Sequence, residues 1–187
     1  MNPVEINNQI LPSVLILIST VFFFVVERLF PGRKLPHVNG WYVRAIFINL
    51  LQLGMLGVAG LTWNKYFRSY SLFQFGGWSS PVLEGLFYWF IGTFIFYWWH
   101  RWRHEHDFLW LGFHQIHHSP QRLEVITSFY KHPGEMMVNS IIGSLLVYAF
   151  LGLSIEAGAI YTLCTALGEF FYHTNMKTPR WVGFFFQ

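Results

Sequence analysis

Residues 81–118 read PVLEGLFYWFIGTFIFYWWHRWRHEHDFLWLGFHQIHH, and this stretch decides how the rest of the chain is interpreted. Its first part, 81–99, is apolar and aromatic with Glu84 as its one charged residue, and the histidines begin at the next position, His100. A helix of about 20 mostly apolar residues is long enough to cross the roughly 30 Å hydrocarbon core of a bilayer. The stretch therefore predicts a membrane span that ends directly in a histidine-rich segment, 100–135.

The composition of the whole chain agrees with a membrane location. Of its 187 residues, 53% are hydrophobic and only 11% are charged, whereas a soluble domain carries about 25% charged residues. The net charge of +3 comes from few residues and includes no basic patch interleaved with aromatics, so we expect no nucleic-acid partner. The single cysteine, Cys164, excludes an internal disulfide. The length predicts one domain, residues 1–187.

Other apolar runs complete the predicted membrane domain. Residues 10–26 and 45–64 carry no charge and predict the first two spans. The run 136–168 would be about 50 Å long as a single helix, which is too long for one span. Gly, Leu and Ser at 152–154 supply a break, and we therefore expect a tight helical hairpin at 136–172. The predicted fold class is an all-α, multi-pass membrane bundle of about four spans with a histidine-rich metal-binding cap.

The distribution of basic residues predicts the orientation of this bundle. The predicted topology places ten Lys and Arg residues on one face and two on the other, and the positive-inside rule makes the richer face cytoplasmic. Eight of the nine histidines fall on that same face, and His37 stands alone in a loop. The ten basic residues are Arg28, Arg33, Lys34, Arg44, Arg101, Arg103, Arg122, Lys131, Lys177 and Arg180, and the two are Lys65 and Arg68.

The histidine spacing predicts metal ligands. His100 and His104 lie four residues apart and share one face if the third span continues as a helix. In HQIHH, His114 can pair with both His117 and His118, whose rings diverge by about 100° around the helix. One short helix thus presents nitrogens in two directions, which suits a pair of metal ions.

A further candidate ligand depends on the hairpin. His173 lies across the membrane from the other histidines if 136–168 is one span, whereas a hairpin returns it to them. Glu169, four residues earlier, is either a carboxylate ligand beside His173 or a partner in an ion pair.

Three more residues near the candidate ligands have open roles. His132 precedes Pro133, which restricts it to an extended or turn conformation, so a structural role is at least as well supported as ligation. His106 points away from the His100 and His104 face, and with Asp107 it is expected to be solvated or to orient a ligand ring.

Residue types narrow the kind of metal site. Cysteine-based zinc and iron–sulfur sites are excluded, and the HExxH pattern of zinc proteases is absent. Imidazole ligands suit iron, zinc, copper or nickel. A membrane metal transporter would need ligands at mid-membrane depth, where Glu84 and Glu156 alone offer weak support.

The motifs HRWRH, HQIHHS, KHP, EFFYHTN and TPRW resemble those of the fatty acid hydroxylase and sterol desaturase superfamily of integral membrane di-iron oxygenases. The resemblance runs from the third span to the C-terminus. It implies non-haem di-iron bound by six histidines, with dioxygen as co-substrate and a hydroxylated or desaturated lipid as product. It also implies an external electron donor, similar to cytochrome b5 or ferredoxin, and a location in the bacterial inner membrane or the endoplasmic reticulum. The six histidines are His100, His104, His114, His117, His118 and His173.

The chain departs from the family pattern in two places. Some members carry a histidine where this chain has Glu169, and a final HxxHH is expected shortly after the terminal WVGFFFQ. We therefore expect a chain cut short before its last ligands, binding one metal well and a second poorly. The alternative is a non-catalytic fragment or pseudoenzyme that binds metal or lipid. Sterol, fatty acid, sphingolipid, alkyl lipid and carotenoid substrates all stay open.

Overall fold

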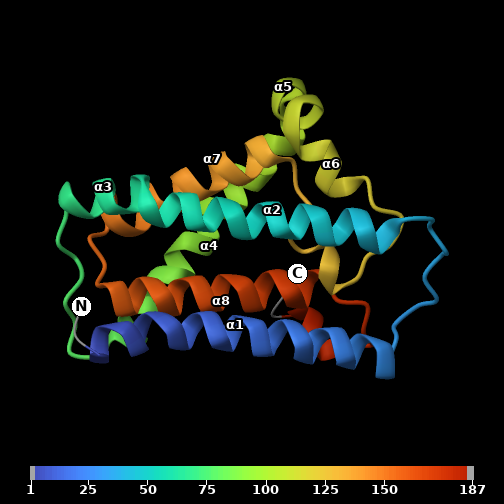
Figure 1. Ribbon diagram of the computed structural model, residues 1–187, viewed down its shortest axis with the longest axis horizontal. Coiled ribbons are helices and arrows are strands. Elements are labelled where there is room, and N and C mark those ends of the chain that lie inside the picture. Colours follow the sequence, from blue (N-terminus) through green and yellow to red (C-terminus); the bar gives the residue numbers. More distant parts are fainter. Residues whose placement is uncertain (1–2, 185–187) are drawn as a thin grey trace.

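The protein forms a helical bundle, seen here in a computed structural model that describes residues 3–184 (Figure 1). Its long helices are α1 (Pro3–Leu29), α2 (Trp41–Leu61), α4 (Pro81–Glu105), α7 (Pro133–Ser144) and α8 (Ile155–His173). Shorter segments are α3 (Trp63–Ser69), α5 (Asp107–Leu109), η1 (Trp110–His114), α6 (Gln115–His118), η2 (Val125–Thr127), η3 (Leu145–Phe150) and η4 (Arg180–Phe184). No strand occurs within 3–184, as the all-α prediction requires.

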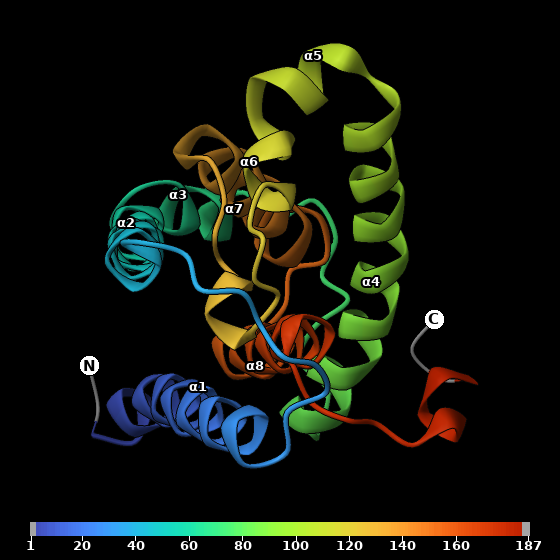
Figure 2. The same cartoon turned by 90° about the vertical axis from the view of Figure 1, so that its right-hand side faces the viewer.

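Helix α8 lies at the centre of the bundle and packs against both α1 and α4, while α2 packs against α7 (Figure 2). One buried cluster joins α4, η3 and α8 around Tyr88, Val147 and Tyr161. A second joins α8 to η2 around Val125 and Phe170, with Phe23 of α1 against it. These contacts fix the direction of α8, which ends at the candidate ligand His173.

The chain reverses direction between α7 and α8 (Figure 1). Helix α7 continues through η3 to Phe150, the chain turns, and α8 begins at Ile155. Gly152 adopts φ 64°, a conformation that glycine reaches without the steric cost of a side chain. The hydroxyl oxygen of Ser154 then accepts a hydrogen bond from the Ala157 N–H, which caps the new helix. The break therefore lies at the predicted 152–154.

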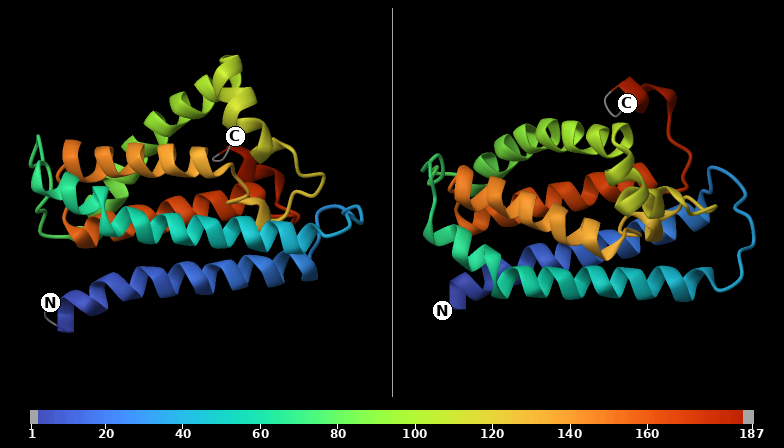
Figure 3. Two further views of the ribbon diagram at one scale, coloured as in Figure 1. Left: turned by 45° about the horizontal axis from the view of Figure 1, so that its top comes forward. Right: turned by 90° about the horizontal axis from the view of Figure 1, so that it is seen from above.

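The histidine-bearing segments lie toward one end of the bundle, and the hairpin turn lies at the other (Figure 1). Residues 30–40 and the chain just after α8 lie at the right in Figure 1, and the stretch from α5 to α6 lies at the top, right of the middle, whereas loop 70–80 and the 151–154 turn lie at the left. Figure 3 shows the same separation from two further directions, with α5 projecting from the body. All nine histidines thus belong to these segments or to the adjoining ends of α4, α7 and α8, and the hairpin topology predicts this placement for eight of them.

Many large apolar side chains face outward, as expected of a surface in contact with lipid. Leu61, Phe90 and Phe94 are 83%, 72% and 65% exposed. Two helical segments within the described chain, 41–69 and Pro81–Glu105, have the length and hydropathy of a membrane span. The count of about four spans and the orientation in the membrane stay predictions.

Two sequence-based boundaries shift. The predicted cap 100–135 begins inside α4, because that helix continues without interruption to Glu105. The last residues of the predicted cap, from Pro133, already belong to α7.

The suggested mid-membrane carboxylates lie elsewhere. Glu84 and Glu156 occupy the first turns of α4 and α8, at the end of the bundle away from the histidines. Glu84 is fully buried and accepts hydrogen bonds from the backbone N–H groups of Gly77, Trp78 and Ser154. It ties loop 70–80 to the hairpin turn, so the transporter interpretation loses its support.

Candidate metal centre

Four histidines from three segments, α4, η1 and α6, converge on one point. The Nε2 atoms of His100 and His104 on α4 are 3.0 Å apart, so the four-residue spacing does place both rings on one face. His114 Nε2 lies 3.3 Å from His104 Nε2 and 3.1 Å from His118 Nε2. One nitrogen from each of the four rings falls within 4.8 Å of all the others. Imidazole nitrogens this close to one another form a donor set that fits a metal ion such as iron.

The two remaining predicted ligands form a separate pair next to this cluster. His117 Nε2 lies 3.2 Å from His173 Nε2, which brings the end of α6 to the end of α8. The other nitrogen of each ring faces a main-chain carbonyl, of Tyr130 at 3.2 Å and of Glu169 at 2.7 Å respectively. Carbonyl groups accept hydrogen bonds only, so both rings carry their proton on Nδ1 and leave Nε2 free as a ligand.

His117 and His118 therefore point to different groups of ligands from adjacent positions. His118 belongs to the four-histidine cluster, and its ring centroid lies 5.2 Å from that of His117. The prediction that this short helix offers nitrogens in two directions agrees with the geometry.

Burial keeps these two imidazoles neutral. The pKa of His117 is lowered to about 2, first by burial and then by the positive charge of Lys131. The pKa of His118 is lowered to about 4, first by burial and then by His114 and His104. Neutral imidazole is the form that binds metal, so both rings are ready to act as ligands near pH 7.

A buried carboxylate that the sequence interpretation missed supports the cluster. Glu135, in the first turn of α7, is 2% exposed, and its Oε1 lies 3.0 Å from Nδ1 of the fully buried His114. Arg103 forms an ion pair with the same oxygen and also contacts His100 Nδ1 at 3.2 Å. Such carboxylate–imidazole contacts orient metal-binding rings in proteins. The sequence feature that could have indicated Glu135 is its place two residues after Pro133, close to the histidine-rich segment.

Two buried atoms of this Arg–Glu pair lack a hydrogen-bond partner. Within the described chain, neither Arg103 Nε nor Glu135 Oε2 has one. Unpaired buried polar atoms are costly, and they are expected near functional groups. Both atoms belong to side chains that contact the fully buried His114 ring.

The other sequence candidates have peripheral positions. His132 Nδ1 accepts a hydrogen bond from Gly134 N–H at 3.0 Å and caps α7, which is the structural role considered above. His106 ends α4 and Asp107 begins α5, and both are exposed and outside the four-histidine cluster. The Glu169 carboxylate lies 3.5 Å from Lys131 Nζ and 3.7 Å from His173 Nδ1, so it pairs with a lysine while remaining beside the histidine.

Comparisons with known proteins agree with this site. Residues 85–187 match the family model described as fatty acid hydroxylase, and the match includes all six histidines. Methylsterol monooxygenase 2-2 of Arabidopsis thaliana is 36% identical over 67 residues, 36% of this chain and 25% of that protein. The very-long-chain aldehyde decarbonylase GL1-8 of Oryza sativa subsp. indica is 32% identical over 103 residues, 50% of this chain and 34% of that protein.

A further relative is the rice very-long-chain aldehyde decarbonylase GL1-11 of the same subspecies, 36% identical over 78 residues, 37% of this chain and 29% of that protein. The chain thus spans between a quarter and about a third of these relatives. No solved structure matches the chain. The family model covers more than half of the sequence, from α4 to the C-terminus, and the chain therefore belongs to the fatty acid hydroxylase family.

Proposed function

We propose that this chain is a membrane-bound non-haem di-iron oxidoreductase that uses dioxygen to hydroxylate or desaturate a lipid. The observation that carries the proposal is a cluster of four histidines whose ring nitrogens converge on one point: His100, His104, His114 and His118. A separate pair, His117 and His173, lies next to it. Family membership supports a lipid-modifying oxygenase. The monooxygenase and decarbonylase relatives support a sterol or very-long-chain aliphatic substrate.

The residues have distinct tasks in this proposal. The four-histidine cluster and the pair formed by His117 and His173 hold the metal ions, which when bound supply the oxidising power that an unactivated C–H bond needs and side chains lack. Glu135 keeps the proton of His114 on Nδ1, so that Nε2 faces the metal. The Glu169 carboxylate lies beside Nδ1 of His173, the nitrogen opposite the proposed ligand atom, and pairs with Lys131, so in this arrangement it supports the ring rather than the metal.

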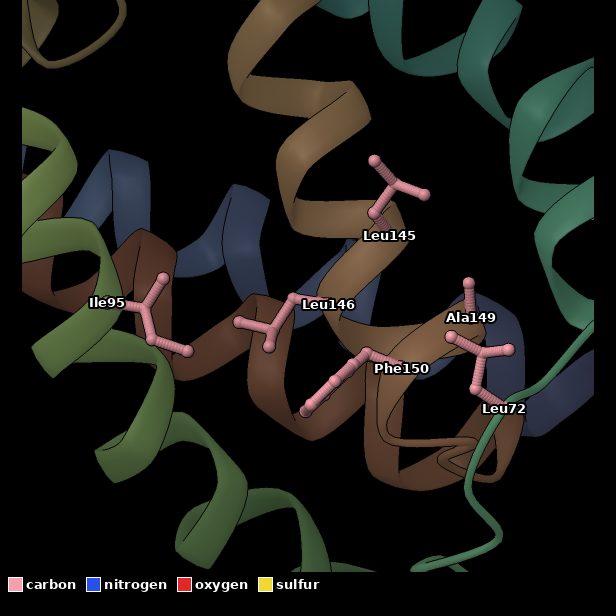
Figure 4. A pocket seen from close by; sticks show the side chains of 6 residues that line it. All are labelled: Leu72, Ile95, Leu145, Leu146, Ala149 and Phe150. Carbon is pink, nitrogen blue, oxygen red and sulfur yellow. The ribbon is translucent and has the colours of Figure 1, made fainter.

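An apolar pocket within the bundle, on the side of loop 70–80 and the hairpin turn (Figure 1), supports a hydrocarbon substrate. A pocket of about 350 Å³ opens between α4, η3 and loop 70–80. Figure 4 shows the side chains that line it, Leu72, Ile95, Leu145, Leu146, Ala149 and Phe150. Ile95, five residues before His100 on the same helix, lies about 7.5 Å along the axis and about 140° around it, so the pocket opens on a different face of α4 from the rings. Entry from the bilayer would let the lipid reach the site without crossing water.

The membrane side and the electron donor complete the proposal. We assign the histidine-bearing end to the cytoplasmic face, since it holds the larger share of the basic residues. An external donor similar to cytochrome b5 or ferredoxin would deliver electrons there.

The direct test is to purify the full chain in detergent, add ferrous iron anaerobically, and measure bound iron and its Mössbauer spectrum. Two irons per chain with the signature of a coupled pair support the proposal, and lipid profiling of expressing cells then identifies the product. Bound iron without any oxygen-dependent change in lipids would favour a non-catalytic metal-binding member. Absence of stoichiometric iron from the wild type would overturn the proposal.

A further inference from the structure

A buried carboxylate on the first helix lies close to the segments that carry His117 and His173. Glu27 is 3% exposed, two residues before the end of α1. Helix α1 contains no histidine and precedes the matched residues 85–187. Neither the family match nor the six-histidine pattern therefore gives this residue a role.

Glu27 accepts hydrogen bonds from two segments that are distant in sequence. Its Oε2 is 2.8 Å from the backbone N of Val125, 3.1 Å from the backbone N of Asn175 and 3.4 Å from the Thr174 hydroxyl. Its Oε1 pairs with Arg28 at 2.8 Å. Hydrogen bonds to an ionised acceptor are stronger than neutral ones, and a buried N–H left without a partner is costly. One carboxylate thus holds residues 125 and 175 at a fixed separation.

Each of these segments is connected to one histidine of the second pair, one through the chain and the other through a hydrogen bond. Thr174 and Asn175 follow His173 at the end of α8. Val125 begins η2, and the chain reaches Tyr130, whose carbonyl accepts the hydrogen bond from His117 Nδ1. Glu27 therefore bridges the two supports whose spacing sets the 3.2 Å approach of His117 to His173.

Neighbouring contacts reinforce the support on the α8 side. The backbone N of Gly32 donates to the Asn175 carbonyl at 2.9 Å, and the Asn175 side chain bonds to both the N–H and the carbonyl of Arg33. Pro31 and Met176 form an isolated β-bridge. Hydrogen bonds thus join the segment after α1 to the segment after α8. Glu27 adds a buried hydrogen bond to the segment after α8.

The four-histidine cluster is held differently. Its ligands come from α4, η1 and α6, and its buried carboxylate is Glu135 on α7. None of the hydrogen bonds described for Glu27 reaches these residues. Loss of Glu27 should therefore affect one group of ligands and spare the other.

We propose that Glu27 is a positioning residue that sets the separation of His117 and His173, and thereby shapes the second of the two metal positions. The role as a metal position rests on the proposed function. The geometric part, the separation of the two side chains, does not depend on it.

The test uses thiol cross-linking in the full chain, in a Cys164→Ala background. With His117→Cys and His173→Cys together, a short bifunctional thiol reagent should link the pair, and adding Glu27→Gln should lower the yield about threefold or more. His104→Cys with His114→Cys serves as the control pair, whose yield should not change. Glu84→Gln is the matched control variant, because Glu84 is also a buried carboxylate that accepts three backbone N–H groups, but at the opposite end of the bundle.

Equal cross-linking of the 117–173 pair with and without Glu27→Gln would overturn the proposal, as would equal losses in both pairs. A second measurement keeps all histidines in place and titrates Glu27→Gln and Glu84→Gln with ferrous iron. We expect Glu27→Gln to lose the weaker of two binding steps and Glu84→Gln to keep both, and retention of both steps by Glu27→Gln would contradict the role. A wild type that binds no iron would remove the proposed function, while the cross-linking result would still decide the role of Glu27.

Discussion

The Oε1 atom of Glu135 lies 3.0 Å from Nδ1 of His114, and neither side chain is accessible to solvent beyond 2%. An ionised carboxylate is only an acceptor, so this contact, which is shorter than the 3.3 Å between Arg103 Nη1 and the same nitrogen, favours the imidazole proton on Nδ1. Nε2 of His114 is then free to face His104 and His118. Twenty-one residues separate the pair along the chain, yet it defines how the most buried ring of the cluster is oriented.

Replacing this carboxylate should weaken metal binding without removing a ligand. We expect Glu135→Gln to lower iron affinity by about 10–100-fold, as loss of a carboxylate behind a metal-binding histidine does in other proteins. Competition with a chelator measures the change. Glu105→Gln is the control, because Glu105 is exposed at the end of α4 and forms an ion pair with Arg101. An affinity for Glu135→Gln equal to that of the control would contradict the assignment.

Removing His114 itself should have a larger effect. His114→Ala takes away a nitrogen that lies between His104 and His118, so the loss of iron affinity should exceed the roughly 100-fold limit expected for an outer partner. Iron content after gel filtration checks this. His106→Ala should retain wild-type iron, since His106 is exposed at the end of α4. Unchanged iron in His114→Ala would sink the assignment of the cluster.

The lowered pKa values of His117 and His118 predict acid sensitivity of the metal-free protein. In the unfolded chain both rings take up protons as the pH falls through 6.5, whereas in the folded chain their pKa values are about 2 and about 4. Below pH 6.5 the unfolded state therefore binds more protons, and stability is lost as the pH falls toward the folded values. It is fully present above pH 6.5.

Thermal unfolding of the metal-free protein in detergent between pH 7.5 and pH 4.5 provides the measurement. The drop in Tm should be smaller in His117→Asn, which cannot take up the proton. If the wild type and this variant lost the same number of degrees over the range, buried neutral His117 would not be the cause.

The contact between α4 and α8 depends on small residues. A Cβ at Gly92 would overlap the Tyr161 ring on α8, whereas a Cβ at Gly57 on α2 would meet nothing within 4 Å. Gly92→Ala should thus destabilise the protein by about 1–3 kcal/mol through overpacking, while Gly57→Ala should be neutral or slightly stabilising. Unfolding in detergent compares the two. A Gly92→Ala variant as stable as Gly57→Ala would show that the two helices separate easily.

Several features of the site follow from local sequence alone. The four-residue spacing of His100 and His104 places them on one helical face, and the same rule brings His118 to His114. The glycine and serine at 152 and 154 end one helix and cap the next. These outcomes depend on the geometry of a single turn or helix, which neighbouring residues impose whatever the rest of the chain does.

Other features depend on contacts between distant segments. The pairing of His117 with His173 requires α8 to pack between α1 and α4. Glu135 and Glu27 acquire their roles only when α7 and α1 meet the histidine-bearing segments. The sequence around a single acidic residue does not show from which distant N–H groups its carboxylate will accept hydrogen bonds. The sequence by itself thus determined the helical segments, the place of the break between α7 and α8, and which residues are candidate metal ligands. Only the tertiary structure divided those residues into a group of four and a pair, because that division is set by helix packing and buried hydrogen bonds between segments far apart in the chain.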